Sequence, residues 1–273
     1  MVQEQLEHTR WFINTGVQLE TTDKKSVEIW EFRHENDEIV LSEWAKHFRG
    51  HYCREEEIDF LREDYGYSRA EYLSEIKLPD KSDRLGPSTM AGDFGEILIS
   101  DFLQYILSYW VPRTRYGNKT VRNESTKGCD IIGFKIVDDG KESLEDTLAI
   151  FEAKTQFSGK KSKPRLQDAV NDSSKDQARR GESLNAIKQR LFGDNRIEEA
   201  RRVGRFQNPE DRPYKELNGA VAIFNTEVFD QEIIQGTDAS NHPNQSNLKL
   251  LVIYGAELMK LVYELYRRTA DEA

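Results

Sequence analysis

Two apolar runs near the middle of the chain carry charged residues at one end. They cover residues 129–134 (CDIIGF) and 148–154 (LAIFEAK). A continuous apolar run such as 148–151 predicts a β-strand that is buried on both faces. Successive strand residues point to opposite faces, so Glu152 and Lys154 share one face while Ala153 points into the opposite layer. If the strand that carries Asp130 pairs with this one, its carboxylate reaches the same place.

The remaining pattern predicts further strands and helices around these two runs. Period-two alternation or short apolar runs indicate strands, and apolar residues on one helical face indicate helices. Strands are predicted at residues 11–13, 26–32, 114–119, 219–225 and 248–255. Helices are predicted at residues 39–51, 52–76, 91–110, 167–192 (with breaks near 171–174 and 181) and 256–269. Residues 236–247 are predicted to be a loop, and Asp139-Gly140 to be the turn of a hairpin-like connection.

A connector rich in residues that favour turns separates the first part of the chain from the rest. It covers residues 78–89 (LPDKSDRLGPST). We therefore expect an N-terminal α+β region of residues 1–85, which faces a partner, and a main domain of residues 86–273. The boundary is expected to be soft, with the N-terminal region packed on the main domain.

The composition indicates a soluble, cytoplasmic protein. Of the 273 residues, 37% are hydrophobic and 32% are charged, and no run approaches the roughly 18 apolar residues of a membrane-spanning helix. The two cysteines, Cys53 and Cys129, make no disulfide framework. His47, His51 and Cys53 have a spacing that can gather a metal on one helical face, but Gly50 interrupts the helix and no fourth ligand is evident.

The net charge of −10 argues against strong unaided binding to DNA, because phosphate contacts depend on clustered Lys and Arg. Residues 154–205 are different, with 14 Lys and Arg against 7 Asp and Glu. This segment predicts contacts to a nucleic-acid backbone from Lys160, Lys161, Lys163, Arg165, Arg179 and Arg180. The alternative is an ordinary solvated helix, since Asp168, Asp172 and Asp176 interleave with the basic residues.

Asp130, Glu152 and Lys154 are the residue types that metal-dependent phosphodiester hydrolysis uses. Two carboxylates are hard oxygen donors that Mg²⁺ accepts while it keeps several waters. Lys154 would lie beside a metal-bound water, where it assists the attack and neutralises charge on the phosphate oxygens. The alternative is a Glu-x-Lys on a solvated strand face, because charged residues are most often simply exposed.

Glu96 is a further candidate ligand, on the predicted helix of residues 91–110. It falls on one helical line with Ile99, Leu103 and Leu107, which should face protein. A carboxylate on such a line costs free energy unless it is paired or binds a metal. The alternative is a first-turn Glu that the helix dipole favours.

The order of these elements resembles the core of the PD-(D/E)xK nuclease superfamily, with Cys129 where a Pro often precedes the Asp. Four segments are also similar to the HamA family, the nuclease subunit of the Hachiman anti-phage system. They are residues 91–96 (AGDFGE), 126–130 (TKGCD), 151–154 (FEAK) and 166–176 (LQDAVNDSSKD).

This resemblance implies an α/β fold with a restriction-endonuclease-like core, a mixed central sheet flanked by helices. It also implies a Mg²⁺- or Mn²⁺-dependent DNA nuclease, with Glu96, Asp130 and Glu152 as metal ligands and Lys154 as a catalytic residue. Lys175 and Gln177 are added as nucleic-acid contacts, because related nucleases draw a polar residue from the helix after the Lys strand. The implied partner is a helicase, HamB, that restrains the nuclease. A second hypothesis is a nuclease-like fold that serves the helicase as a catalytically inactive adaptor or DNA sensor.

Overall fold

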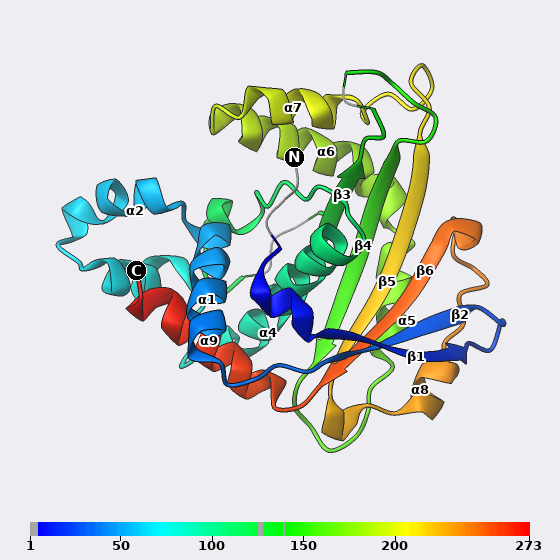
Figure 1. Cartoon of the computed structure of the whole chain (residues 1–273), viewed down its shortest axis with the longest axis horizontal. Helices are drawn as coiled ribbons and strands as arrows, with labels where there is room; N and C mark the ends of the chain where they lie inside the picture. Colours follow the sequence, from blue (N-terminus) through cyan, green and yellow to red (C-terminus); the bar gives the residue numbers. More distant parts are fainter. Residues whose placement is uncertain (1–4, 125–127, 139) are drawn as a thin grey trace.

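The computed structural model describes residues 5–124, 128–138 and 140–273, and its centre is a six-stranded mixed sheet (Figure 1). The strand order is β1-β2-β6-β5-β4-β3. The strands are β1 (Phe12–Glu20), β2 (Ser26–Phe32), β3 (Ile131–Lys135), β4 (Thr147–Gln156), β5 (Lys215–Asn225) and β6 (Leu248–Gly255). The four central strands β2, β6, β5 and β4 are parallel to one another. The edge strand β1 is antiparallel to β2, and the edge strand β3 is antiparallel to β4. The mixed sheet flanked by helices confirms the predicted α/β class.

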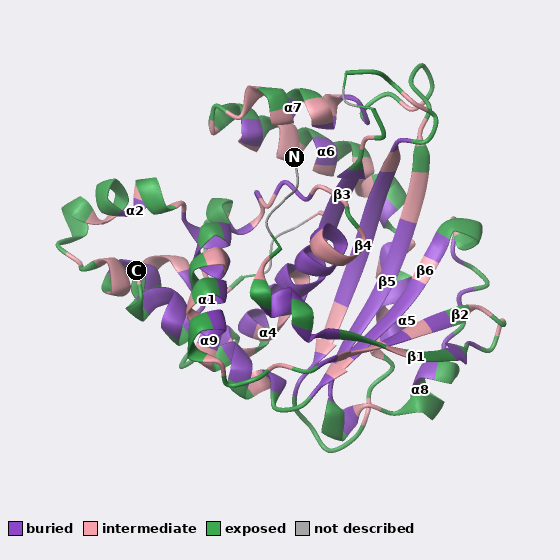
Figure 2. Ribbon diagram, viewed as in Figure 1, coloured by how far each residue is buried: buried purple, intermediate pink, exposed green. Residues whose placement is uncertain are grey.

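The central strands are apolar because both of their faces are covered. β4, β5 and β6 are coloured mostly as buried in Figure 2. On one face, Ala149, Phe151 and Ala153 belong to the core that α4 covers. On the other face, Leu148 and Ile150 pack against residues of α6. The prediction from the continuous apolar run, a strand buried on both sides, is confirmed.

One face of the sheet is covered mainly by α4 (Gly86–Asp101), α1 (Glu38–Tyr52) and α9 (Leu258–Asp271), which share the largest core cluster with β4, β5 and β6. A π-helical turn, η4 (Phe102–Ile106), continues α4. The same side carries η1 (Glu7–Trp11), α2 (Glu55–Arg62), η2 (Glu63–Tyr65), α3 (Arg69–Tyr72) and η3 (Leu73–Lys77).

The other face is covered by α5 (Arg165–Ser173), α6 (Asp176–Gly193) and α7 (Ile197–Gly204). Leu166 and Val170 of α5 pack on β5 and β6, and Leu184 and Leu191 of α6 pack on β3 and β4. The short elements η6 (Thr226–Val228), α8 (Gln231–Gln235) and η7 (Gln245–Asn247) lie in the connection between β5 and β6.

Several predicted elements differ from the structure. The predicted helix 52–76 is broken into α2, η2, α3 and η3, and the predicted strand 11–13 covers only the start of β1. The predicted helix 91–110 begins earlier, at Gly86, because Pro87 suits the first turn of a helix, where its missing N–H is not needed. The predicted strand 114–119 is wrong: these residues belong to no strand and contain the single turn η5 (Tyr116–Asn118). The predicted helix 167–192 is two helices, which are separated at Ser174 and Lys175.

The N-terminal region joins the same sheet and core as the rest of the chain. β2 pairs with β6, with Val27 opposite Leu250, and α1 packs beside α9. The division at residue 85 stays a prediction. The described helices include none that is both long enough and apolar enough to cross a membrane. Thr126, Lys127 and Asp139, which belong to a motif and a turn predicted above, lie outside the described residues.

Candidate active site

The pairing of β3 with β4 brings Asp130 and Glu152 together. Ile131 lies opposite Phe151 in this antiparallel pair, and continuing the register by one residue places Asp130 opposite Glu152. Residues directly opposite each other on neighbouring strands point to the same face of a sheet. Lys154 points there too, since its Nζ donates to Glu152 Oε1 at 2.6 Å. The predicted grouping of Asp130, Glu152 and Lys154 is therefore present.

This group faces the layer formed by α5 and α6. Lys154 Nζ also forms an ion pair with Asp172 of α5 at 2.8 Å, and Lys175 Nζ donates to the same carboxylate at 2.6 Å. Glu152 is buried, with 5% of its side chain exposed, whereas Lys154 is 25% exposed. The ammonium group thus lies between a buried carboxylate and the solvent.

Burial and neighbouring charges shift the protonation of both residues. Burial, and then the charge of Asp130, raises the pKa of Glu152 to about 9, although Lys154 opposes the shift. Burial alone would lower the pKa of Lys154, but Glu152 and Asp172 outweigh it and raise that pKa above its ordinary value. Lys154 is therefore an ammonium ion at neutral pH, so it supplies positive charge and hydrogen bonds and does not act as a base.

Glu96 approaches Asp130 from the opposite side of the sheet, because it lies on α4. Arg115 joins the two carboxylates: its Nε is 3.0 Å from Glu96 Oε2 and its Nη2 is 2.8 Å from Asp130 Oδ1. The hydroxyl of Tyr116 also donates to Glu96. Burial raises the pKa of Glu96 to about 8, and Asp130 adds to this shift while Arg115 opposes it.

The three predicted metal ligands are neighbours but not a close cluster. Among the described residues, one group of three or more His, Cys, Asp or Glu side chains has ligand atoms that all lie within 4.8 Å of one another. That group does not contain Glu96, Asp130 or Glu152. The structure therefore places Glu96 and Asp130 on the Arg115 guanidinium group, and Glu152 beside Asp130 on the neighbouring strand.

Asp176 and Arg115 are site residues that the sequence analysis missed. Asp176 begins α6, is fully buried, and has no hydrogen-bond partner on either carboxylate oxygen. Burial, and then the charge of Asp130, raises the pKa of Asp176 to about 7. Its sequence signal was an Asp among Lys and Arg residues, which is typical of a solvated helix. Only the packing of α6 on β3 and β4 shows that Asp176 is buried.

Residues 111–119 form a strap that neutralises the buried acids of α4. Arg113 Nη2 lies 2.7 Å from Asp101 Oδ1, Arg115 pairs with Glu96 as described, and Lys119 pairs with Asp93. The segment is thus held to α4 through its side chains, and its backbone belongs to no strand.

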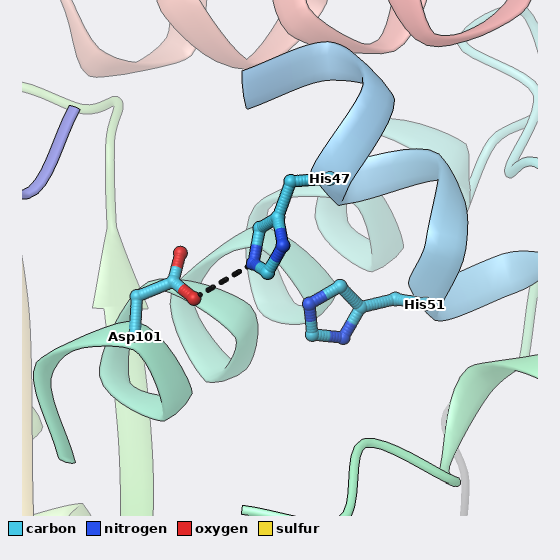
Figure 3. A group of neighbouring side chains, drawn as sticks. All are labelled: His47, His51 and Asp101. Carbon is cyan, nitrogen blue, oxygen red and sulfur yellow. Dashed lines mark hydrogen bonds and ion pairs between the residues drawn. The ribbon is translucent and has the colours of Figure 1, made fainter. Parts of the chain in front are cut away.

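The close group of possible ligand atoms is His47, His51 and Asp101 (Figure 3). His47 and His51 lie one turn apart on α1 and point toward Asp101, and His47 Nε2 is 3.0 Å from Asp101 Oδ1. Arg113 already occupies this group, because its Nη1 lies 3.1 Å from His47 Nε2 and 2.7 Å from His51 Nε2. The guanidinium group of Arg113 therefore takes the position that a metal ion would need in this group. Cys53, the third residue of the predicted spacing, is not part of the group.

The predicted nucleic-acid contacts fall into two sets. Lys160, Lys161 and Lys163 are exposed in the loop that follows β4, close in sequence to Lys154. The others lie on α5 and α6, and three of them already have acidic partners: Arg165 with Asp168, Lys175 with Asp172, and Arg180 with Glu216. Gln177 is exposed and Arg179 is half-buried.

A cavity of about 70 Å³ adjoins the site. Its lining includes Asp130, Arg113, Arg115, Arg190 and Ser183. Burial, and then the charge of Arg115, lowers the pKa of Arg190. The cavity thus places arginine side chains beside Asp130.

Comparison with known proteins gives one family. No curated protein matches the chain. The sequence matches the HamA family over residues 7–269, which includes every residue of the site described above. HamA is a component of the Hachiman system of anti-phage defence. The chain therefore belongs to the HamA family and has a role in anti-phage defence.

Proposed function

We propose that this protein is a metal-dependent nuclease that hydrolyses phosphodiester bonds of DNA. The observation that carries the proposal is the pairing of Asp130 opposite Glu152, with Lys154 bound to Glu152 on the same face. Two carboxylates can bind a divalent ion, and an ammonium group beside them can stabilise negative charge on a phosphate during hydrolysis of a phosphodiester bond.

The residues present fit such an ion. Glu152 Oε2 and both carboxylate oxygens of Asp176 are buried without a hydrogen-bond partner, and carboxylate oxygens are the ligands that Mg²⁺ and Mn²⁺ prefer. Asp130 and Glu152 would hold the ion. When bound, it supplies Lewis-acid charge and lowers the pKa of a water molecule.

The protein's own groups then bind and orient the DNA. Lys154, held as an ammonium ion by Glu152 and Asp172, stabilises negative charge that develops on the phosphate. Arg190 and Arg115 line the adjoining cavity with positive charge, which suits a phosphate group. Lys160, Lys161 and Lys163 extend this charge into the solvent, where they would contact the DNA backbone.

The partner that we propose is the helicase HamB. A net charge of −10 limits unaided attraction to DNA. A helicase that binds DNA would raise the local concentration of substrate at this site.

The alternative function is an inactive adaptor or DNA sensor for the helicase. One observation favours it: Arg115 joins Glu96 to Asp130, and Lys154 joins Glu152 to Asp172, so cations of the protein already pair with these acids. In that case the carboxylates serve only to hold the structure together.

Metal titration and cleavage assays separate the two functions. The protein, alone and with the helicase, is incubated with plasmid DNA in Mg²⁺, in Mn²⁺ and in EDTA. A nuclease cleaves only with metal, and Glu152→Gln abolishes cleavage without unfolding the protein. Cleavage that persists in Glu152→Gln would refute the assignment of the site. Binding of metal should also raise the unfolding temperature of a nuclease by mass action, and an adaptor would show no such shift.

A further inference from the structure

The carboxylates around Asp130 differ in what already binds them. Glu96 accepts from the Tyr116 hydroxyl and pairs with Arg115. Glu152 has one oxygen bound to Lys154, and its other oxygen, Oε2, has no hydrogen-bond partner. Asp176 has no nitrogen or oxygen donor on either carboxylate oxygen, and only the thiol of Cys129, a weak donor, lies beside it. The unfilled oxygens are therefore on Glu152 and Asp176.

The same carboxylates also lie on different sides of the sheet. Glu152 and Lys154 share a face with Ile150, which packs in one cluster with Leu184 and Leu191 of α6. Asp176 is the first residue of that same helix, and it lies near Cys129, whose Sγ is 3.9 Å from the Asp176 carbonyl oxygen. Glu96 instead lies on α4, which packs against the opposite face.

Burial makes the isolation of Asp176 costly. Its relative exposure is 0%, and that of Glu152 is 4%. A buried carboxylate without a partner is unfavourable unless it becomes neutral or binds a cation. Elsewhere in the described chain, buried Asp93, Asp101 and Asp146 each have a Lys or Arg partner.

We propose that Asp176 is a ligand of the divalent cation together with Asp130 and Glu152, and that Glu96 is a positioning residue that holds Arg115 beside Asp130. This inference rests on the proposed function and changes its ligand set. Neither the set of Glu96, Asp130 and Glu152 nor the set of Asp130, Glu152 and Asp176 has all of its ligand atoms within 4.8 Å of one another. The choice of Asp176 over Glu96 therefore depends on its unfilled oxygens and on the face of the sheet that it shares with Glu152. Mg²⁺ keeps several waters, which can bridge to carboxylates that do not touch it directly.

The experiment compares the full-length wild type with Asp176→Asn, Glu96→Gln and a matched control, Asp168→Asn. Asp168 lies on the neighbouring helix α5, is 40% exposed and pairs with Arg165. Binding of Mn²⁺ alone is measured by electron paramagnetic resonance, and thermal unfolding is measured in EDTA and in Mn²⁺.

We expect Asp176→Asn to unfold at a higher temperature than the wild type in EDTA, because the substitution removes an unpartnered buried charge. The same variant should bind Mn²⁺ at least about tenfold more weakly. Glu96→Gln and Asp168→Asn should bind Mn²⁺ as the wild type does. A residue with only a structural role would not raise stability without metal while weakening metal binding.

Two results would overturn the inference and leave the proposed function in place. One is wild-type affinity for Mn²⁺ in Asp176→Asn, and the other is a loss of affinity in Glu96→Gln as large as that in Asp176→Asn. A wild type that binds no Mn²⁺ and cleaves no DNA would overturn both the inference and the proposed function.

Discussion

At the scale of single residues, the buried acids Asp93, Asp101 and Asp146 each pair with a Lys or Arg. Asp146, for example, is fully buried and pairs with Arg205 at 3.0 Å. The site around Asp130 departs from this rule, because the Asp176 carboxylate and Glu152 Oε2 have no hydrogen-bond partner there. Buried carboxyl groups without partners are expensive for folding alone, and carboxyl groups with raised pKa values are the pattern expected where a cation binds.

Lys154→Ala tests the role of the ammonium group. We expect the rate of metal-dependent cleavage to fall by roughly 10²–10⁴-fold, because a positive charge beside the phosphate is lost. The measurement is the initial rate of plasmid cleavage with metal and helicase present. Lys260→Ala is the control, since Lys260 is 77% exposed on α9. Equal rates in Lys154→Ala and wild type would exclude a catalytic role for this lysine.

Arg115→Gln tests the guanidinium group that joins Glu96 to Asp130. Removing one partner of a buried ion pair leaves uncompensated charge, so we expect a loss of about 3 kcal/mol in the free energy of unfolding without metal. Denaturant unfolding in EDTA and in Mn²⁺ measures it. Mn²⁺ should restore part of the loss, because the cation neutralises Asp130. A loss that is identical with and without Mn²⁺ would contradict this account.

At the scale of elements, α4 lies so close to β4 that a glycine is required at the contact. A Cβ added at Gly95 would clash with Thr155 Cγ2 and would lie 3.3 Å from Ile223 Cδ1. Gly95 also precedes Glu96, so the approach of the helix sets the position of this carboxylate.

Gly95→Ala should therefore lower the free energy of unfolding by about 1–3 kcal/mol through overpacking. Gly92→Ala on the same helix is the matched control, since a Cβ there meets nothing within 4 Å. That control should gain roughly 0.5–1 kcal/mol, because Ala is the better helix former. Denaturant unfolding measures both variants. If Gly95→Ala stabilised the protein as much as Gly92→Ala does, the close approach of α4 to β4 would be refuted.

The network of α1, α4 and the strap predicts a pH dependence. Arg113 can only donate, so His51 Nε2 accepts its hydrogen bond and His51 is neutral. Burial, and then the charge of Arg113, lowers the pKa of His51 well below 6.5, and burial also lowers that of His8. Below pH 6.5 these two histidines therefore bind more protons in the unfolded chain than in the folded chain, so their contribution to stability falls as pH falls. Glu96, Glu152 and Asp176, whose pKa values are raised, contribute in the opposite direction.

Each such histidine contributes a slope of up to about 1.4 kcal/mol per pH unit. The difference in the free energy of unfolding between His51→Gln and the wild type should therefore shift in favour of the variant from pH 7.5 to pH 5.5, as measured by denaturant unfolding. His34→Gln is the control, because His34 lies at the surface and contacts the carbonyl oxygen of Ala256. An unchanged slope in His51→Gln would show that His51 is not the group that titrates.

At the scale of the whole molecule, the two ends of the chain and the site belong to one sheet and one core. Phe32 of β2 packs in the same cluster as Phe94 of α4 and Tyr266 of α9. Loss of the N-terminal strands would therefore expose the edge of β6 as well as the core beneath α1.

We expect unfolding to be a single transition in which the N-terminal region and the sheet unfold together. Trp110→Phe leaves Trp11, Trp30 and Trp44, all before residue 85, as the only tryptophans. Their fluorescence then reports the N-terminal region, and far-ultraviolet circular dichroism reports the whole chain. Coincident transitions in denaturant are expected. Two separate transitions would indicate an independent N-terminal domain.

The sequence alone determined the strands β2 to β6 and the grouping of Asp130, Glu152 and Lys154, but it predicted only the start of β1. Residues 26–32, 219–225 and 248–255 were predicted as strands and are strands, because their apolar patterns are local. Glu152 and Lys154 share a face because every second residue of a strand does so. The placement of Asp130 beside them followed from one assumption, the pairing of two nearby strands.

Only the tertiary structure decided which charges meet across long separations in the chain. Arg115 lies between Glu96 and Asp130, and Asp176 is buried against β3, although neither has a periodic pattern that marks it. The prediction of residues 114–119 as a strand was wrong for a related reason: the local pattern does not show that the charged side chains of this segment pair with α4. The energy of a buried charge depends on its partners in space and on the loss of water, and local sequence patterns encode neither.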